Sequence, residues 1–575
     1  MVARVQSETS GRLGPDEREA SWRRLGEETF DLVIVGGGVV GVGSALDAAT
    51  RGLRVALVEA RDLASGTSSR SSKLFHGGLR YLEQLEFGLV REALRERELM
   101  LTRLAPHLVK PVSFLYPLTR RVWERPYTAA GLLMYDTMGG ARSVPGQKHL
   151  TRAGALRMVP ALKRDALIGG IRYYDAQADD ARHTMMVGRT AAHYGAVVRT
   201  STQVVGFLRE ADRVSGVRVR DVEDGRETEV RAHAVINATG VWTDELQRLS
   251  GSRGRFRVRA SKGVHIVVPR DRIVSESGLI LRTEKSVLFV IPWRNHWIVG
   301  TTDTDWNLDL AHPAATRADI DYILEHVNSV LATPLTHDDI EGVYAGLRPL
   351  LAGESESTSK LSREHAVARV APGLVAIAGG KYTTYRVMGA DAVDAAAVDL
   401  PGRIQASITD KVPLIGADGY HALVNQADQL AARYGLHPYR VRHLLDRYGS
   451  LVHEVLASAD PELLKPLPGA PDYLQVEVTY AASHEGALHL EDVLTRRTRI
   501  SIEYPHRGVD CAEDVARLMA GVHGWDDDRV AREVQVYTAR VESERASQAE
   551  PDDQAADAVR SAAPEARPDL VEPVS

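Results

Sequence analysis

The pattern of apolar and polar residues near the start of this chain predicts a strand, a helix and a second strand. Residues 31–35 form a short, mostly β-branched run, which is typical of a buried parallel strand. Residues 42–51 are predicted to be the helix, and residues 54–59 the second strand. The connection between the first strand and the helix is rich in glycine, with Gly36, Gly37, Gly38 and Gly41. This order of elements is that of a nucleotide-binding βαβ unit.

The rest of the chain changes from strand patterns to helical patterns near residue 400. An amphipathic helix is predicted at residues 86–105, after a Ser/Gly-rich loop at residues 61–82 whose length usually indicates a function. Helical periodicity dominates from about residue 419 to residue 545. Further strands are expected at residues 214–219, 234–240, 263–268, 287–292, 297–301 and 374–377.

These patterns predict an α/β fold class with four parts. Residues 1–28 are polar and are expected to be a flexible extension. Residues 29–400 are predicted to form a nucleotide and substrate domain, and residues 401–545 a separate helical domain. Residues 546–575 lack a face that could be buried, so an acidic disordered tail is expected there.

Charge and composition exclude several classes of protein. The net charge is -6, and the nine acidic and three basic residues from Glu542 onward account for all of it, which leaves the body near neutral. A nucleic-acid-binding protein would usually show a basic stripe, so no nucleic acid is expected as a partner. Cys511 is the single cysteine, which rules out an intramolecular disulfide and a cysteine-based metal cluster. No secretory signal is found, and the longest uncharged run, residues 32–46, is too short to span a bilayer, so membrane contact would be peripheral.

The glycine-rich turn carries the clearest candidate chemistry. Glycines there allow a tight turn and a close approach of the backbone to a pyrophosphate, whose charge the helix N-terminus would favour. Glu59 ends the second strand, where its carboxylate could accept hydrogen bonds from an adenosine ribose and would repel a 2′-phosphate. The turn alone does not separate FAD from NAD.

Three further motifs are more specific. Residues 67–83 read TSSRSSKLFHGGLRYLE. Residues 345–350 read AGLRPL and are followed by Ser362, Arg363 and Glu364. Residues 378–386 read AGGKYTTYR after an apolar strand.

Together these motifs resemble the FAD-dependent glycerol-3-phosphate dehydrogenase family, the respiratory, aerobic type. The order of NATG at 237–240, KGVH at 262–265, IPW at 291–293 and GTTD at 300–303 agrees with the family, and the resemblance covers roughly residues 30–507. It implies an FAD-binding Rossmann-like domain of the glutathione-reductase/D-amino-acid-oxidase type, with an inserted antiparallel substrate sheet and a C-terminal helical domain. It also implies FAD as the cofactor. Non-covalent binding is expected, because no attachment residue is indicated.

The resemblance assigns site residues one by one. Substrate contacts are expected from Arg80, Tyr81, Arg348, Arg363, Lys381 and Thr383. Catalytic roles are expected for His265, Arg348 and Lys381. FAD contacts are expected from Gly36, Gly38, Val39, Val40, Gly41, Glu59, Ala60, Thr67, Ser68, Ser69, Ser72, Lys73, Leu74, His76, Gly77, Ala238, Gly240, Gly380, Lys381, Tyr382 and Thr383.

Physical chemistry supports several of these roles. The planar guanidinium of arginine binds phosphate oxygens in a bidentate way, although any one arginine in this chain is more often a surface residue. His265 is favoured as the proton acceptor because a neutral imidazole takes a proton near neutral pH. His76 is its rival but is expected against the flavin ring, with Ser72 and Leu74. The turn at Gly379 and Gly380, which opens a helix, could stabilise negative charge on a reduced flavin.

The predicted reaction is oxidation of sn-glycerol 3-phosphate to dihydroxyacetone phosphate, with hydride transfer to FAD and electrons passed to membrane quinone. The alternatives are a glycerol-3-phosphate oxidase that uses oxygen, an amine oxidase or demethylase of the wider flavin family, and a flavin-binding module without catalysis. The expected location is cytoplasmic and peripheral on the inner face of the cell membrane, and residues 120–134 are the candidate contact. No metal site is indicated, and a homodimer is compatible with the sequence.

Overall fold

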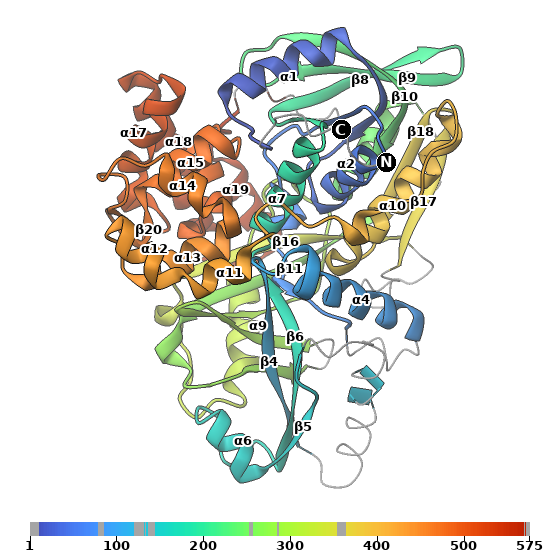
Figure 1. Cartoon of the computed structure of the whole chain (residues 1–575). Coiled ribbons are helices and arrows are strands. Elements are labelled where there is room, and N and C mark those ends of the chain that lie inside the picture. Colours follow the sequence, from blue (N-terminus) through green and yellow to red (C-terminus); the bar gives the residue numbers. More distant parts are fainter. Residues whose placement is uncertain are drawn as a thin grey trace.

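Two large β-sheets and a helical part make up the described portion of the chain (Figure 1). The computed structural model describes residues 11–78, 86–119, 131–132, 134–135, 144–251, 257–283, 287–352, 364–567 and 570. Within these residues no helix has both the length and the apolar character that a membrane crossing needs.

The first sheet is mostly parallel and begins with the predicted βαβ unit. Its strand order is β17-β18-β10-β1-β2-β7, in which β17 runs antiparallel to β18 at the edge. Strand β9 also pairs antiparallel, with both β10 and β8. Helices α2, α7 and α10 pack over one face, and helix α1 over the other. The bounds are α1 Pro15–Glu27, β1 Thr29–Val35, α2 Val39–Thr50, β2 Val55–Val58, α7 Asp180–His193, β7 Val197–Arg199, β8 Thr202–Glu210, β9 Arg213–Asp221, β10 Glu227–Asn237, β17 His365–Ala371, β18 Leu374–Gly379 and α10 Tyr385–Ala396.

The second sheet is inserted between strands of the first and has the order β15-β11-β14-β13-β12-β4-β6-β3, with β16 on β11 and β5 on β6. It is mixed, which corrects the antiparallel sheet expected from the sequence. Strands β12 and β4 pair in parallel, because they come from distant parts of the chain and no hairpin imposes the opposite direction. Helices α6 and α9 contribute to the apolar core beneath it. The bounds are β3 Leu74–Phe75, β4 Val109–Leu118, β5 Lys148–Thr151, α6 Arg152–Met158, β6 Gly169–Ala178, β11 Val258–Pro269, β12 Gly278–Arg282, β13 Val287–Trp293, β14 His296–Gly300, β15 Thr304–Trp306, α9 Arg317–Asn328 and β16 Gly342–Leu351.

The helical part follows both sheets and also contains one short hairpin, β19 and β20. Its helices bury two apolar clusters, one around Leu444 and one around Leu494. The bounds are α11 Tyr420–Asn425, α12 Ala427–Tyr434, α13 Pro438–Tyr448, α14 Val452–Ala457, β19 Pro466–Leu467, β20 Ala470–Leu474, α15 Gln475–His484, α16 Ile500–Glu503, α17 Ala512–His523, α18 Asp527–Ser547 and α19 Asp553–Ser561. Helices α4 Phe87–Leu99 and α8 Thr243–Leu249 lie outside these groups.

Both ends of the described chain are more ordered than the sequence suggests. Helix α1 occupies much of the expected flexible extension, because Leu25 is buried and Arg18 pairs with Asp221. Helix α19 lies in the segment that was expected to be a disordered tail. Arg560, near the end of this helix, and Arg567, after it, are each only 4% exposed. Both terminal segments are buried by contacts with residues that are distant in sequence, and the composition of the segments alone did not indicate these contacts.

Candidate active site

The glycine-rich turn brings backbone, strand and helix into close contact. Gly36 has φ +112°, and a Cβ atom on Gly41 would lie 1.8 Å from the carbonyl oxygen of Gly36. Only glycine therefore fits at position 41 without displacing the backbone. The N–H of Val39 donates to Ser68 Oγ at 2.9 Å, which ties the loop after β2 to the start of α2.

Glu59 lies at the carboxyl end of β2, as a ribose-binding acid should. Its two carboxylate oxygens accept hydrogen bonds from the N–H groups of Gly37 at 2.6 Å and Arg61 at 2.8 Å. Burial raises the pKa of Glu59, and these two backbone donors oppose that rise. The side chain is thus oriented by the backbone before any ligand binds.

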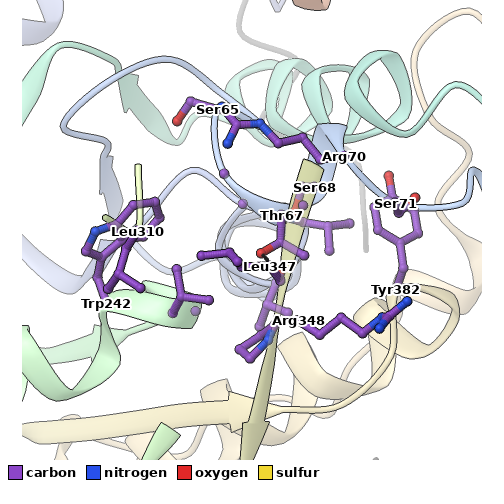
Figure 2. A pocket seen from close by; sticks show the side chains of 18 of the residues that line it. Ser65, Thr67, Ser68, Arg70, Ser71, Trp242, Leu310, Leu347, Arg348 and Tyr382 are labelled. Carbon is purple, nitrogen blue, oxygen red and sulfur yellow. Dashed lines mark hydrogen bonds between the residues drawn. The ribbon is translucent and has the colours of Figure 1, made fainter. Parts of the chain in front are cut away.

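A cavity of about 1460 Å³ extends from Glu59 to His265, Arg348 and Lys381. It exceeds the roughly 300–1,000 Å³ of ordinary small-molecule pockets, so it has room for a dinucleotide and a second small molecule. Figure 2 shows Thr67, Ser68, Leu347 and Arg348 around one part of it. The other predicted residues that line it are Gly36, Gly38, Val39, Val40, Ala60, Ser72, Leu74, His76, Ala238, Gly240, Gly380, Tyr382 and Thr383.

His265 projects from β11 into this cavity and is 2% exposed. Its ring stacks on Tyr344 of the neighbouring strand β16 with centroids 4.7 Å apart, and Nε2 lies 2.8 Å from Ser72 Oγ. Burial holds the pKa of His265 well below its usual range, and the charges of Arg348 and Lys73 lower it further. The imidazole is consequently neutral at neutral pH, which is the form that accepts a proton.

Arg348 places positive charge beside His265, and Lys381 lines the same cavity. Arg348 lies on β16 and donates to Thr302 O at 3.3 Å, and its guanidinium is 3.3 Å from the Asp303 carboxylate. The Arg348 side chain is 23% exposed, so it remains accessible from the cavity. Lys381 follows β18 and also lines the cavity.

The turn after β18 differs from a simple strand–helix junction. Gly379 and Gly380 both have positive φ, at +76° and +83°. Helix α10 begins only at Tyr385, after one 3-10 turn, and the N–H of Gly380 already donates to Glu364 O at 3.3 Å. The Gly380 amide is therefore already engaged, which leaves Lys381 as the clearer source of positive charge here.

Four predicted FAD contacts do not line the cavity. Lys73 turns away, with φ +58°, and its buried ammonium lies 3.0 Å from Asp180. The N–H of Gly77 donates to the Tyr135 hydroxyl at 2.7 Å. Ser69 and Gly41 serve the packing of the loop and the turn. Their motif positions did not reveal this, because adjacent residues in a loop can point in opposite directions.

The cavity also has walls that the sequence analysis missed. Trp242 and Arg70 line it, and Arg70 donates to Ala311 O at 2.9 Å (Figure 2). Trp242 follows the carboxyl end of β10, a position where open α/β sheets bind ligands, so that signal was present. Residues 561, 563, 565 and 570 line it too, and no local sequence signal indicated them.

Three predicted substrate residues, Arg80, Tyr81 and Arg363, lie outside the described residues, as does most of the candidate membrane segment. Among the described residues no group of His, Cys, Asp and Glu is arranged to hold a metal ion.

Comparisons with known proteins agree with this geometry. The family described as FAD dependent oxidoreductase matches residues 31–386, and the family described as C-terminal domain of alpha-glycerophosphate oxidase matches residues 407–530. The chain is 73% identical to glycerol-3-phosphate dehydrogenase 2 of Mycobacterium tuberculosis, over 98% of this chain and 96% of that protein. This chain belongs to the FAD-dependent glycerol-3-phosphate dehydrogenase family.

More distant relatives extend the likeness. The mitochondrial glycerol-3-phosphate dehydrogenase of Homo sapiens is 36% identical, over 92% of this chain and 75% of that protein. The solved structure of glycerol-3-phosphate dehydrogenase from Bacillus halodurans, complexed with FAD, aligns with a TM-score of 0.76 and 29% identity, covering 92% of this chain and 98% of that one. FAD is therefore the cofactor, and the glycine turn, Glu59 and the cavity fit it.

Proposed function

We propose that this protein oxidises sn-glycerol 3-phosphate to dihydroxyacetone phosphate, with FAD as hydride acceptor and membrane quinone as the final electron acceptor. The observation that carries the proposal is the meeting of a neutral imidazole, His265, with two cations, Arg348 and Lys381, in the cavity that ends at Glu59. Names of similar proteins support the choice of substrate.

The chain's own residues account for substrate binding. Arg348 can bind phosphate oxygens with its planar fork, and the Asp303 carboxylate and Thr302 carbonyl hold that fork in place. Thr383 is fixed by its hydroxyl, which accepts from the His76 N–H at 3.2 Å. Arg80, Tyr81 and Arg363 complete the proposed substrate set.

The proton step falls to His265. FAD, when bound, supplies the hydride acceptor for the C2 hydrogen of the substrate. The hydroxyl proton passes to the His265–Ser72 pair, whose imidazole is neutral and whose ring is held by stacking on Tyr344. Lys73 and Arg348 disfavour a charged imidazole, so the proton can leave again after the hydride step.

The deciding experiment is the visible spectrum of the purified protein without oxygen, before and after addition of sn-glycerol 3-phosphate. Prompt loss of the oxidised-flavin band is expected, and glycerol without the phosphate should leave the band unchanged. A band that persists with sn-glycerol 3-phosphate would contradict the proposed substrate.

The acceptor is tested separately, because one matched family is described by an oxidase. The reduced protein should be reoxidised faster by a soluble quinone than by oxygen at equal concentration. Faster reoxidation by oxygen would favour the alternative, a glycerol-3-phosphate oxidase. The location at the inner face of the cell membrane is part of the same proposal, and co-sedimentation with anionic vesicles tests it.

A further inference from the structure

The chain after α18 returns to the two sheets and contributes to the cofactor cavity. Helix α19 packs on α18 at the junction between the helical part and the sheets (Figure 1). Beyond α19, Ala563, Glu565 and Leu570 line the cavity that extends from Glu59 to His265, and so does Ser561 at the end of the helix. Residues 550–567 are called the strap below.

The first half of the strap is anchored on the cavity wall. Ala556 is fully buried in a cluster that includes Val241 and Leu347, two residues that line the cavity. Asp553 pairs with the buried ammonium of Lys262. The Asp557 carboxylate accepts a hydrogen bond from the Asp309 N–H at 3.2 Å.

The second half is anchored beside Glu59. Arg567 is 4% exposed, its Nη2 lies 3.1 Å from the Asp492 carboxylate, and its Nε donates to Ser201 Oγ at 2.9 Å. The N–H of Ser201 in turn donates to Arg61 O at 2.7 Å, and the next N–H, that of Thr202, donates to Glu59 O at 2.7 Å.

A second contact of the strap also lies near Glu59. The Glu565 carboxylate binds the His312 ring and lies 3.8 Å from the Arg61 guanidinium. Burial alone would raise the pKa of Glu565, but the hydrogen bond with the His312 ring and the charge of Arg61 lower it to about 2, so the carboxylate is charged at neutral pH. The strap is therefore held at both of its ends by charged pairs.

We infer that the strap is part of the cofactor site: it covers the adenosine end of the FAD cavity and slows the release of FAD. The contacts with Arg61 and Ser201 place its second half over that end, while Asp553 anchors its first half to Lys262 of β11, the strand that also carries His265. The inference rests on the placement of the adenosine beside Glu59. It does not depend on the identity of the substrate.

The test compares FAD release from the full chain with release from a chain that stops after Ala549. Holoenzyme is diluted without free FAD, and the rise of flavin fluorescence is followed. Release should be faster in the shortened chain by about tenfold or more, because lost contacts at a binding site act mainly on dissociation. Equal release rates within about twofold would overturn the inference.

A point substitution keeps the test decisive if the shortened chain does not fold. Arg567→Ala removes the second anchor and should also speed FAD release. The matched control is Arg517→Ala, which removes an exposed arginine paired with Glu513 at 2.8 Å on α17 and should leave release unchanged. Equal release from Arg567→Ala and Arg517→Ala would again overturn the inference.

Two further measurements separate this inference from the proposed reaction. Glu59→Ala should speed FAD release, and an unchanged rate would overturn the placement of the strap at the adenosine end. If sn-glycerol 3-phosphate fails to bleach the flavin, the proposed substrate is wrong, but the release rates still report on the strap.

Discussion

His265 shows how neighbours at the residue scale prepare a side chain for chemistry. Stacking on Tyr344 sets the plane of its ring, and Ser72 Oγ sets the direction of Nε2. Burial and two nearby cations keep the ring neutral by lowering its pKa. A histidine chosen from the KGVH motif thus has the environment of a proton acceptor.

Replacing His265 with asparagine should slow flavin reduction by about 10²- to 10⁴-fold while FAD stays bound, because proton acceptance by a positioned base contributes that much. Stopped-flow absorbance with sn-glycerol 3-phosphate measures the effect. His337→Asn is the control, since His337 is an exposed residue paired with Asp321 at 2.7 Å. Equal reduction rates in the two variants would remove His265 from the mechanism.

The lowered pKa of His265 also predicts a pH profile. Because its pKa in the folded protein lies below 6.5, the imidazole stays neutral as the pH falls from about 7.5 to about 6. The reduction rate at saturating substrate should therefore stay flat over this interval. A decline with a midpoint near 6.5 that disappears in His265→Asn would show that the ring titrates normally.

At the scale of elements, the turn between β1 and α2 depends on the absence of side chains. Gly41 lies on α2, five residues after Gly36, and the two backbones meet there. Glycine within a helix normally costs about 1 kcal/mol relative to alanine. The close contact explains why α2 carries one despite that cost.

Gly41→Ala should weaken FAD binding and lower thermal stability, because its Cβ would lie 1.8 Å from a carbonyl oxygen. Gly88→Ala is a matched control on helix α4, since a Cβ there has no neighbour within 4 Å. It should be neutral or stabilise the protein by up to about 1 kcal/mol. FAD titration and differential scanning fluorimetry measure both variants, and equal behaviour would contradict the packing argument.

A second element contact predicts a pH effect on stability. His489 is fully buried between Glu223, which follows β9, and Glu533 of α18, at 3.0 and 2.9 Å. Its pKa is raised to about 9, despite burial, by the two carboxylates. The folded pKa lies above the unfolded value near 6.5, so the contribution is fully present below pH 6.5 and is lost as the pH rises through about 9.

The free energy of unfolding in urea should therefore fall between about pH 7 and 9.5, by up to about 3 kcal/mol from this group. His489→Gln should be less stable at pH 7 and should lose this part of the pH dependence. The same slope in both proteins would assign the effect to other groups.

At the scale of the whole molecule, buried charges join the helical part to the nucleotide domain. Asp62, in the loop after β2, accepts from Arg496 at 2.6 Å and from Arg497 at 2.7 Å. Arg182 of α7 donates to Glu485 at 2.9 Å, beyond the end of α15. These pairs align the helical part with the loop that lines the cavity.

Asp62→Asn should lower the free energy of unfolding by about 3–5 kcal/mol, because it leaves the buried Arg497 guanidinium without its carboxylate partner and removes one of the three carboxylates around Arg496. The control is Asp428→Asn, since Asp428 pairs with Arg442 on the surface with 76% of its side chain exposed. That change should cost under about 1 kcal/mol. Urea unfolding of both variants measures the two losses of stability. Similar losses would show that the buried contacts of Asp62 with Arg496 and Arg497 are not a structural link.

The amino-acid sequence by itself determined the local elements and the cofactor. The spacing of Gly36, Gly41 and Glu59 identified the nucleotide unit, and the family resemblance identified FAD. The resemblance also predicted roles for His265, Arg348 and Lys381, which line one cavity. Such features are readable because periodicity and glycine requirements act over a few residues.

Only the tertiary structure decided which neighbours share a cavity. It turned Lys73 toward Asp180, ordered α1 against Asp221, paired β12 with β4 in parallel and folded Arg567 onto Asp492. Each of these contacts joins residues far apart in the chain. The desolvation cost of a buried charge is offset only when an oppositely charged residue lies beside it. No local pattern records that partner, so an acidic, polar segment was expected to be a disordered tail although its residues form part of the cofactor cavity.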